Sequence, residues 1–152
     1  MEWLGQIGFA LPLGLGAIGS ALGIGAAGRG AAGAWAKEGR EGKNLDFRYV
    51  ILTAMPLSQT IYGLLVSLVI LKPALIASVG ANGGWIFCVG LAAGLGELFS
   101  AWMQGQIGCA GIRAMSESEG KPFANTMIAM GIAETVGIFA FVFMFMLMPK
   151  IG

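Results

Sequence analysis

The sequence contains no histidine, and only 11% of its 152 residues are charged. The lack of histidine removes the usual ligand for transition metals and the usual side chain for proton exchange near neutral pH. The low charge excludes an ordinary soluble domain, in which about a quarter of the residues are charged. The two cysteines, Cys88 and Cys109, lie about six helical turns apart in one apolar segment, too far apart for a disulfide. Any chemistry must therefore rest on other polar groups.

The sequence is rich in long apolar segments. Hydrophobic residues make up 57% of the chain, and the mean hydropathy is +0.80. A helix needs about 20 apolar residues to cross the ~30 Å hydrocarbon core of a bilayer. The sequence therefore predicts an all-α membrane protein with four transmembrane helices, of which the first and third project beyond the bilayer. The four apolar runs cover residues 4–36, 49–71, 85–115 and 123–148.

Basic residues gather at one end of these runs. The segment 37–48 holds four of the nine basic residues, and the segment 116–122 holds another. The opposite ends have only Lys72 and Lys150. Because basic loops stay on the cytoplasmic side, we expect a multi-pass protein of the cell membrane with loops 37–48 and 116–122 in the cytoplasm and both termini outside.

The two halves of the chain resemble each other. The glycine-rich segment 14–21 matches 94–101, and Gln59-Thr60 matches Glu134-Thr135. We interpret this as a tandem duplication, with chance similarity between glycine-rich helices as the alternative. One copy has a carboxylate where the other has its neutral amide. The predicted units are a first transmembrane hairpin at 1–78 and a second at 79–152.

Small residues dominate the first apolar run, which has eight glycines between positions 14 and 33. Small residues let membrane helices approach backbone to backbone. The pattern predicts a first helix that is crowded on more than one side, as in the inner wall of a tight ring. A compact four-helix bundle with one closely packed helix is the alternative.

A single carboxylate, Glu134, interrupts the fourth run. An acid at mid-bilayer costs about 2.5–3.5 kcal/mol on insertion scales, so such a residue usually marks an ion path or a proton relay. Counted along the helices from the predicted cytoplasmic turns, Gln59, Gln104 and Glu134 lie at similar depth. We expect these three side chains to converge where the hairpins meet.

The residues around Gln59 supply further oxygen atoms. A proline inside a helix, here Pro56, removes a backbone hydrogen bond and frees carbonyls near residues 52–55. Ser58 adds a hydroxyl, and Tyr62 lies on the same helix face, where its phenol can donate to Glu134. One carboxylate with several neutral oxygens favours Na+ over Ca2+, which usually gathers several carboxylates. A proton would need fewer oxygen partners and is the alternative ion. If these polar residues bind no ion, their role is to form hydrogen bonds between the helices.

Glu97 is a second acid within a predicted span. It lies two helical turns before Gln104, on roughly the same face and nearer the outside. Two interpretations are open: Glu97 lines an exit path for the ion, or it is a protonated or partnered acid on a helix face. We favour the second.

Three motifs resemble the proteolipid (K or c) subunit of V/A-type ATPases, most closely that of bacterial sodium-transporting enzymes. The resemblance covers nearly the whole chain and implies a non-catalytic, four-helix subunit of a rotor ring that carries ions. Its motifs are MPLSQTIYG at 55–63, QGQIGCAGI at 104–112 and Ala133-Glu134-Thr135.

The resemblance also implies roles for single residues. Glu134 would carry the ion, and Tyr62 would stabilise it. The other Na+ ligands would be Gln59, Gln104, Ser58 and the Met55 carbonyl. The family more often has threonine at position 58, and serine keeps the hydroxyl. No covalent cofactor is implied, only bound Na+ or H+.

The implied partners are further copies of the chain in a ring, a stator subunit with an essential arginine, central-stalk subunits at the cytoplasmic loops, and membrane lipid. No nucleic acid is expected. Three other interpretations compete: a duplicated c subunit of an F-type ATP synthase, a small four-helix cation or drug antiporter, and a structural membrane protein without transport. The structural protein would leave the cost of burying two glutamines and a glutamate unexplained. In the antiporter we would expect the acid in the first span beside an aromatic-lined cavity.

Overall fold

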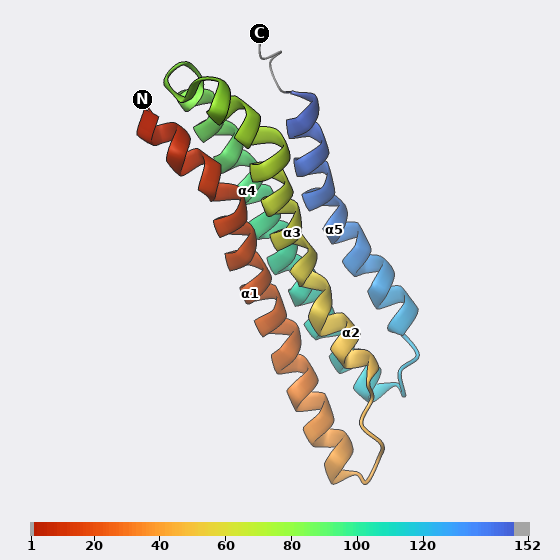
Figure 1. Ribbon diagram of the computed structural model, residues 1–152. Helices are drawn as coiled ribbons and strands as arrows, with labels where there is room; N and C mark the ends of the chain where they lie inside the picture. The colour runs from red at the N-terminus through yellow and green to blue at the C-terminus, as the bar shows by residue number, and fades with distance from the viewer. Residues whose placement is uncertain (1, 148–152) are drawn as a thin grey trace.

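The computed structural model describes residues 2–147, and this part of the chain is helical without a strand. Four stretches are long and apolar enough to cross a membrane: Glu2–Arg40, Arg48–Ala77, Gly80–Glu117 and Phe123–Met146. The predicted all-α fold with four spans is confirmed (Figure 1). The elements are α1 (Glu2–Arg40), α2 (Arg48–Ala54), the 3₁₀ turn η1 (Met55–Leu57), α3 (Ser58–Leu65), the π-helical segment η2 (Val66–Leu71), α4 (Lys72–Glu117) and α5 (Phe123–Met146).

The helices extend past the apolar runs that predicted them. α1 continues to Arg40 rather than ending at residue 36, and the second span continues through Lys72 to Ala77. Charged side chains at these ends can reach water without interrupting the helix, so hydropathy alone ends the spans too early. The predicted end of the fourth span at Met148, and Lys150, lie outside the described residues.

The chain reverses direction within the segment labelled α4, at the end of the bundle where the chain begins (Figure 1). α4 therefore supplies the end of the second span and all of the third (Figure 1). This turn lies at the same end of the bundle as the start of α1 and the end of α5. The loops 41–47 and 118–122 lie at the opposite end (Figure 1).

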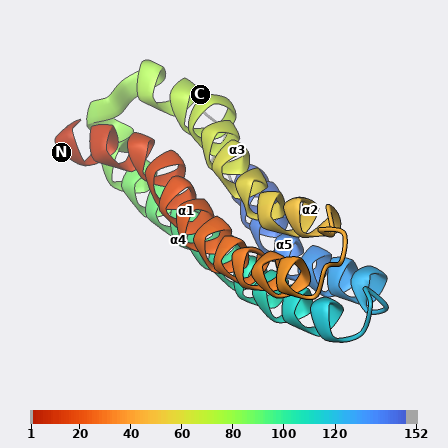
Figure 2. The same cartoon turned by 90° about the horizontal axis from the view of Figure 1, so that it is seen from below.

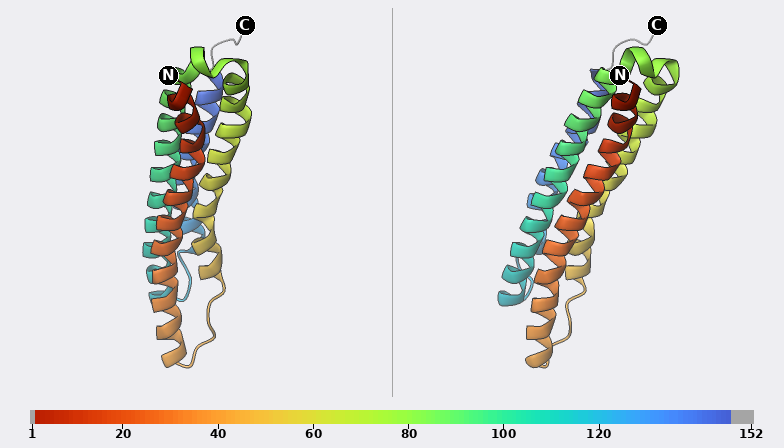
Figure 3. Two further views of the ribbon diagram at one scale, coloured as in Figure 1. Left: turned by 60° about the vertical axis from the view of Figure 1, so that its left-hand side comes forward. Right: turned by 90° about the vertical axis from the view of Figure 1, so that its left-hand side faces the viewer.

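α1 and the third span run side by side along most of their length (Figures 1 and 3). α3 packs mainly on α1, and α5 packs mainly on α4. Viewed along the bundle, the second and fourth spans lie on one side of the α1–α4 pair (Figure 2). The arrangement therefore consists of a tightly packed inner pair and two helices that lean against it.

Glycines make the contact between α1 and α4 possible. A Cβ atom at Gly105 would overlap the Gly23 carbonyl oxygen, and one at Gly90 would overlap that of Gly8. The predicted close approach of backbones is therefore present within the chain. Gly14 and Gly33 differ, because a Cβ there would meet no atom within 4 Å. These two glycines are not needed for packing inside one chain.

Gly105→Ala is expected to destabilise the protein because its Cβ has no space beside Gly23. Overpacking of this kind typically costs about 1–3 kcal/mol. Gly39→Ala is the matched control, since it makes the same change at the loop end of α1, where a Cβ would meet no atom within 4 Å. Thermal unfolding of the detergent-solubilised complex measures both variants. If the midpoint temperature of unfolding for Gly105→Ala is as high as that of the control, the close packing of Gly105 on Gly23 is contradicted.

Two apolar clusters seal the middle of the bundle from both ends. Their separation leaves a central layer that contains the buried side chains of Gln59, Ser100 and Gln104. Towards the loops 41–47 and 118–122 lies a cluster that includes Ala27, Tyr49, Leu52, Ile112 and Met130. Towards the opposite end lies a cluster that includes Val66, Ile70, Ile86, Val89 and Ala93.

The loop 41–47 is tied to its flanking helices. Buried Glu38 accepts hydrogen bonds from the Tyr49 hydroxyl at 2.5 Å and the Asp46 backbone N–H at 3.0 Å. Arg48 pairs with Asp46 at 2.6 Å and also donates to the Gly120 carbonyl oxygen at 3.3 Å. The two loops at this end are therefore held together through one arginine.

The Asp46–Arg48 pair makes the loop sensitive to acid. The hydrogen bonds from the Arg48 side chain hold the pKa of Asp46 below its usual value. The stabilisation is therefore complete above the unfolded pKa of about 3.9 and is lost as the pH falls through the lower, folded value. Asp46→Asn is expected to cost about 0.5–1 kcal/mol at pH 7, after solvent screening, and progressively less in acid.

Thermal unfolding from pH 7 down to pH 3 tests this expectation. Glu41→Gln is the control, because the Glu41–Lys43 pair lies on the exposed surface of the same loop. A difference between wild type and Asp46→Asn that stays constant over the whole pH range would contradict the assigned role of Asp46.

Candidate functional site

A continuous chain of hydrogen bonds crosses the middle of the bundle and ends at Glu134. The Tyr62 hydroxyl donates to Glu134 Oε1 at 3.0 Å, and Gln104 Nε2 donates to Glu134 Oε2 at 3.2 Å. Gln59 Nε2 donates to Gln104 Oε1 at 3.3 Å. The Ser58 hydroxyl reaches both Gln59 Oε1, at 3.1 Å, and the Met55 carbonyl oxygen, at 3.2 Å. The structure thus brings all six predicted site residues together.

Three helical spans supply these groups. Glu134 comes from α5 and Gln104 from the third span, while the other groups come from the second span. Pro56 lies in the 3₁₀ turn η1, which places the Met55 carbonyl beside the Ser58 hydroxyl. A proline at this position cannot donate a backbone hydrogen bond, which explains the local departure from α-helix. The convergence predicted from helix depth is therefore present in the structure.

Burial differs among these side chains. Gln59 and Gln104 are fully buried at 0% exposure, whereas Glu134 is only half-buried. Glu134 therefore lies at the boundary between the interior of the chain and its outer side. A group in this place can exchange a ligand with the surroundings more readily than the two amides behind it.

Ser100 belongs to the same network, although sequence reasoning did not select it. Its hydroxyl accepts a hydrogen bond from Gln59 Nε2 at 3.0 Å and donates to the Ala133 carbonyl oxygen at 2.9 Å. Two signals in the sequence could have found it. Ser100 lies one helical turn before Gln104, and it matches Ser20 in the repeat.

The other polar residues near the motifs lie elsewhere. Thr60 donates to Ser20 at 2.8 Å and so joins the second span to α1. Gln106 is exposed, on a different side of the third span from Gln104. Both residues are outside the hydrogen-bond chain that ends at Glu134.

Glu97 is fully buried, and neither of its carboxyl oxygens has a hydrogen-bond partner among the described residues. A partner for this acid was one of the expected possibilities, and the described part of the chain provides none. Because Glu97 has 0% exposure, it also does not open to the outer side of the chain as Glu134 does.

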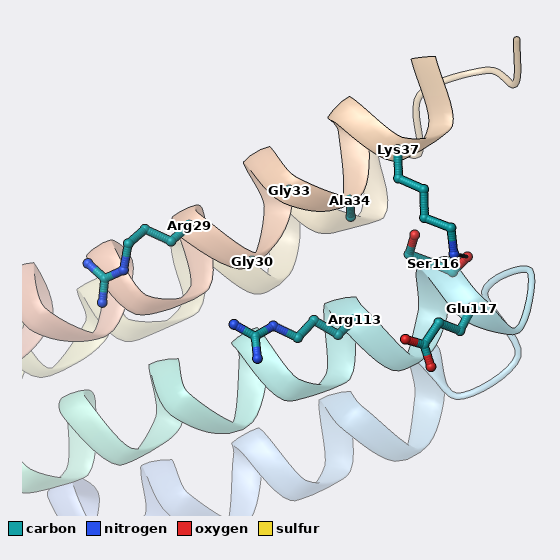
Figure 4. A pocket seen from close by; sticks show the side chains of 8 residues that line it. All are labelled: Arg29, Gly30, Gly33, Ala34, Lys37, Arg113, Ser116 and Glu117. Carbon is teal, nitrogen blue, oxygen red and sulfur yellow. Dashed lines mark hydrogen bonds between the residues drawn. The ribbon is translucent and has the colours of Figure 1, made fainter. Parts of the chain in front are cut away.

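A separate groove of about 260 Å³ lies between α1 and the third span, towards the loops. Arg29 and Arg113 extend along it in the same direction, and Lys37 donates to the Ser116 carbonyl oxygen at 3.3 Å (Figure 4). Both arginines are exposed, and their side chains extend away from the loop end where Lys37 and Ser116 lie (Figure 4). The groove contains none of the residues of the hydrogen-bond chain.

The donor set around Glu134 limits the chemistry. Within residues 2–147 no group of three or more histidine, cysteine or acidic side chains could hold a metal ion. The network instead offers one carboxylate with two amides, hydroxyls and a main-chain carbonyl, all of them oxygen donors. Such a set can neutralise one monovalent cation.

The comparisons with known proteins agree with this architecture. The family model that describes the C subunit of ATP synthase matches residues 7–70 and 87–147. The A-type ATP synthase subunit K of Methanocaldococcus jannaschii is 34% identical over 136 residues, which are 90% of this chain and 57% of that protein. The chain therefore spans little more than half the length of this relative. The two matched segments fall in the first and second predicted hairpins, and the chain belongs to the family of ATP synthase C subunits.

Proposed function

We propose that the chain is a proteolipid rotor-ring subunit of a V/A-type rotary ATPase that carries Na+ at Glu134. The observation that carries the proposal is the hydrogen-bond chain from Tyr62 through Glu134, Gln104 and Gln59 to Ser58. The A-type relative favours this interpretation over a duplicated F-type c subunit. The family match does not favour the antiporter.

The ion would be held by Glu134, Gln59, Gln104, Ser58 and the Met55 carbonyl. In the structure Gln104 presents its Nε2 to Glu134, so a bound cation requires the amide to turn its oxygen towards the ion. The terminal torsion of glutamine is broad and roughly two-fold. The turn also gives up the hydrogen bonds of this amide to the Met130 carbonyl oxygen and from Gln59 Nε2, so the bound cation has to replace them. A single carboxylate balances a single positive charge, and the neutral oxygens replace part of the hydration shell. A proton would use Glu134 alone and is the second candidate ion.

Tyr62 would position the carboxylate. Its hydroxyl donates to Glu134 Oε1, which leaves the other oxygen towards Gln104. A hydrogen bond to a charged acceptor contributes about 1.5–3 kcal/mol. Tyr62 thus stabilises the ionised form of Glu134 without itself contacting the cation.

In the proposed ring, α1 and the third span form the inner wall, and the second span and α5 face outwards. The open positions at Gly14 and Gly33 then leave room for a neighbouring copy. The half-buried Glu134 would lie near the outer surface, where its neutralised form tolerates lipid. At the stator the ion would leave, and the bare carboxylate would pair with the stator arginine until another ion enters.

The subunit itself would be non-catalytic, with ATP handled by other subunits of the complex. Each charge moved across the membrane is worth about 2.3 kcal/mol per 100 mV, so several ions must be summed to balance one ATP. The cytoplasmic loops would contact the central stalk, and both termini would face outside.

Carbodiimide labelling of the purified complex, followed by mass mapping, tests the site and the ion together. The reagent attacks a protonated carboxyl in an apolar environment. We expect Glu134 to be modified at low pH and Na+ to suppress the modification at constant pH. Protection by rising pH alone would assign the site to H+. An unmodified Glu134 under all conditions would refute the proposed ion carrier.

A further inference from the structure

Glu97 has no function in the site proposed above, yet it lies beside it. The residue is fully buried in the third span, and both its oxygens lack a hydrogen-bond partner in the described part of the chain. The two ion pairs among residues 2–147 both involve the loop 41–47, so neither reaches Glu97. An ionised carboxylate is strongly disfavoured in such an environment unless a positive charge accompanies it.

The structure provides a space for the Glu97 carboxyl. A Cβ atom at Gly137 on α5 would lie 2.5 Å from Glu97 Oε2, so the missing side chain of Gly137 is what accommodates the acid. The same point lies 3.2 Å from the Ser100 hydroxyl oxygen and 3.2 Å from Gln59 Cγ. The carboxyl therefore projects from the third span towards α5 and ends close to a further oxygen donor.

The internal repeat allows Glu97 and Gly137 to be compared with the matching positions of the first hairpin. When Gln59 is aligned with Glu134, Tyr62 in the first hairpin aligns with Gly137 in the second. In the other helix of each hairpin, Ala17 aligns with Glu97. The first hairpin thus has a small residue and a large one where the second has an acid and a glycine. The buried acid and the glycine that leaves space for it therefore occur together in the second hairpin, and both are missing from the first.

Within the described part of the chain, no ion pair and no hydrogen bond brings a positive charge to Glu97. Tyr62 on α3 is an ionisable neighbour, and Glu134 lies on the adjacent α5. On α1, Gly16 is the close neighbour: a Cβ there would lie 3.5 Å from the Glu97 Cβ. The compensating charge therefore has to come from outside the chain.

We propose that Glu97 holds a second monovalent cation, a proton or a sodium ion, between the third span and α5. The Ser100 hydroxyl, whose oxygen borders the same space at Gly137, would be the additional oxygen for this cation. Because Glu97 is enclosed whereas Glu134 is half-buried, the second cation is resident and Glu134 remains the carrier. The inference rests on burial, the missing partner and the space at Gly137, and it does not require the ion at Glu134 to be sodium.

The test uses the purified complex with Glu97→Gln, Glu97→Ala and Glu134→Gln subunits. Glu97→Ala reproduces the residue found at Ala17 in the first hairpin and serves if the glutamine variant assembles poorly. Cleavage after Arg113 places Glu97 and Glu134 in different fragments, so modification by carbodiimide can be assigned to each acid separately. Equilibrium binding of radioactive Na+ gives the number of ions per chain.

If Glu97 holds a proton, carbodiimide modifies the Glu97 fragment even in Na+ that protects Glu134, and the modification disappears in both Glu97 variants. If it holds sodium, the wild type binds one more Na+ per chain than either Glu97 variant. An unmodified Glu97 fragment together with equal Na+ binding in wild type and both variants would overturn the proposal. The Glu134→Gln complex separates the two sites, because it loses the signal of the carrier site only.

Discussion

Glu134→Gln is expected to abolish Na+ binding at the carrier site, and Na+ transport with it, while the complex still assembles. The substitution keeps the size of the side chain and an oxygen that can accept from Tyr62 or Gln104, but removes the only negative charge in the hydrogen-bond chain. At 4 Å and an effective dielectric constant of about 20, the lost attraction is about 4 kcal/mol, roughly a thousandfold in affinity.

Radioactive Na+ binding to the purified complex and ATP-driven Na+ uptake into reconstituted vesicles measure this loss. Glu117→Gln is the matched control, because Glu117 is an exposed acid at the end of α4, far along the third span from Gln104. The control should bind and transport as the wild type does. Sodium transport that survives in Glu134→Gln would exclude Glu134 as the carrier.

Much of the site could be predicted because, in two antiparallel helices, the number of residues from their shared turn gives each residue's position along the helix axis. With 1.5 Å of rise per residue, counting from a shared turn places Gln104 and Glu134 at one level. The motif around Pro56 added the Met55 carbonyl and the Ser58 hydroxyl to that level. The common level of Gln104 and Glu134 needed only helix geometry and the assumption that polar side chains within a membrane face one another. Helix geometry left the freed carbonyl open within residues 52–55, and the family resemblance selected Met55.

Rotation about the helix axis was harder to predict than height. Ser100 lies one turn from Gln104, but nothing in its local sequence shows that its hydroxyl would join Gln59 to Ala133. The second span also contains a π-helical segment, η2, which changes the rotational phase of the residues that follow. An ideal helix drawn from the sequence would therefore misplace faces in the outer part of this span.

Glu97 shows a different limit of sequence reasoning. An acid in an apolar helix predicts a partner, and the described residues supply none. What accommodates Glu97 is the absence of a side chain at Gly137, on another helix and 40 positions later. A glycine in a membrane helix has many possible reasons, so only the three-dimensional neighbourhood identifies this one.

Gln104→Leu is expected to separate sodium binding from proton binding. Leucine fills a similar volume but removes one proposed ligand of the cation and the hydrogen bond from Nε2 to Glu134. The contact of the amide oxygen with the cation is comparable to a hydrogen bond to a charged group, about 1.5–3 kcal/mol, so its loss should lower Na+ affinity roughly 10- to 100-fold. A proton needs only the Glu134 carboxyl, so modification of Glu134 by carbodiimide should persist.

Gln106→Leu provides the control for this experiment, because Gln106 is exposed two positions further along the same helix. Comparing Na+ protection of Glu134 in both variants measures the effect on the ion rather than on the fold. We expect Gln104→Leu to need roughly 10- to 100-fold more Na+ for the same protection, while Gln106→Leu behaves as wild type. Equal protection in both variants would mean that Gln104 is only a structural link between helices, and the preference for sodium would then lose its main support. Loss of carbodiimide modification in Gln104→Leu would instead show that the amide is needed to hold the Glu134 carboxyl in place.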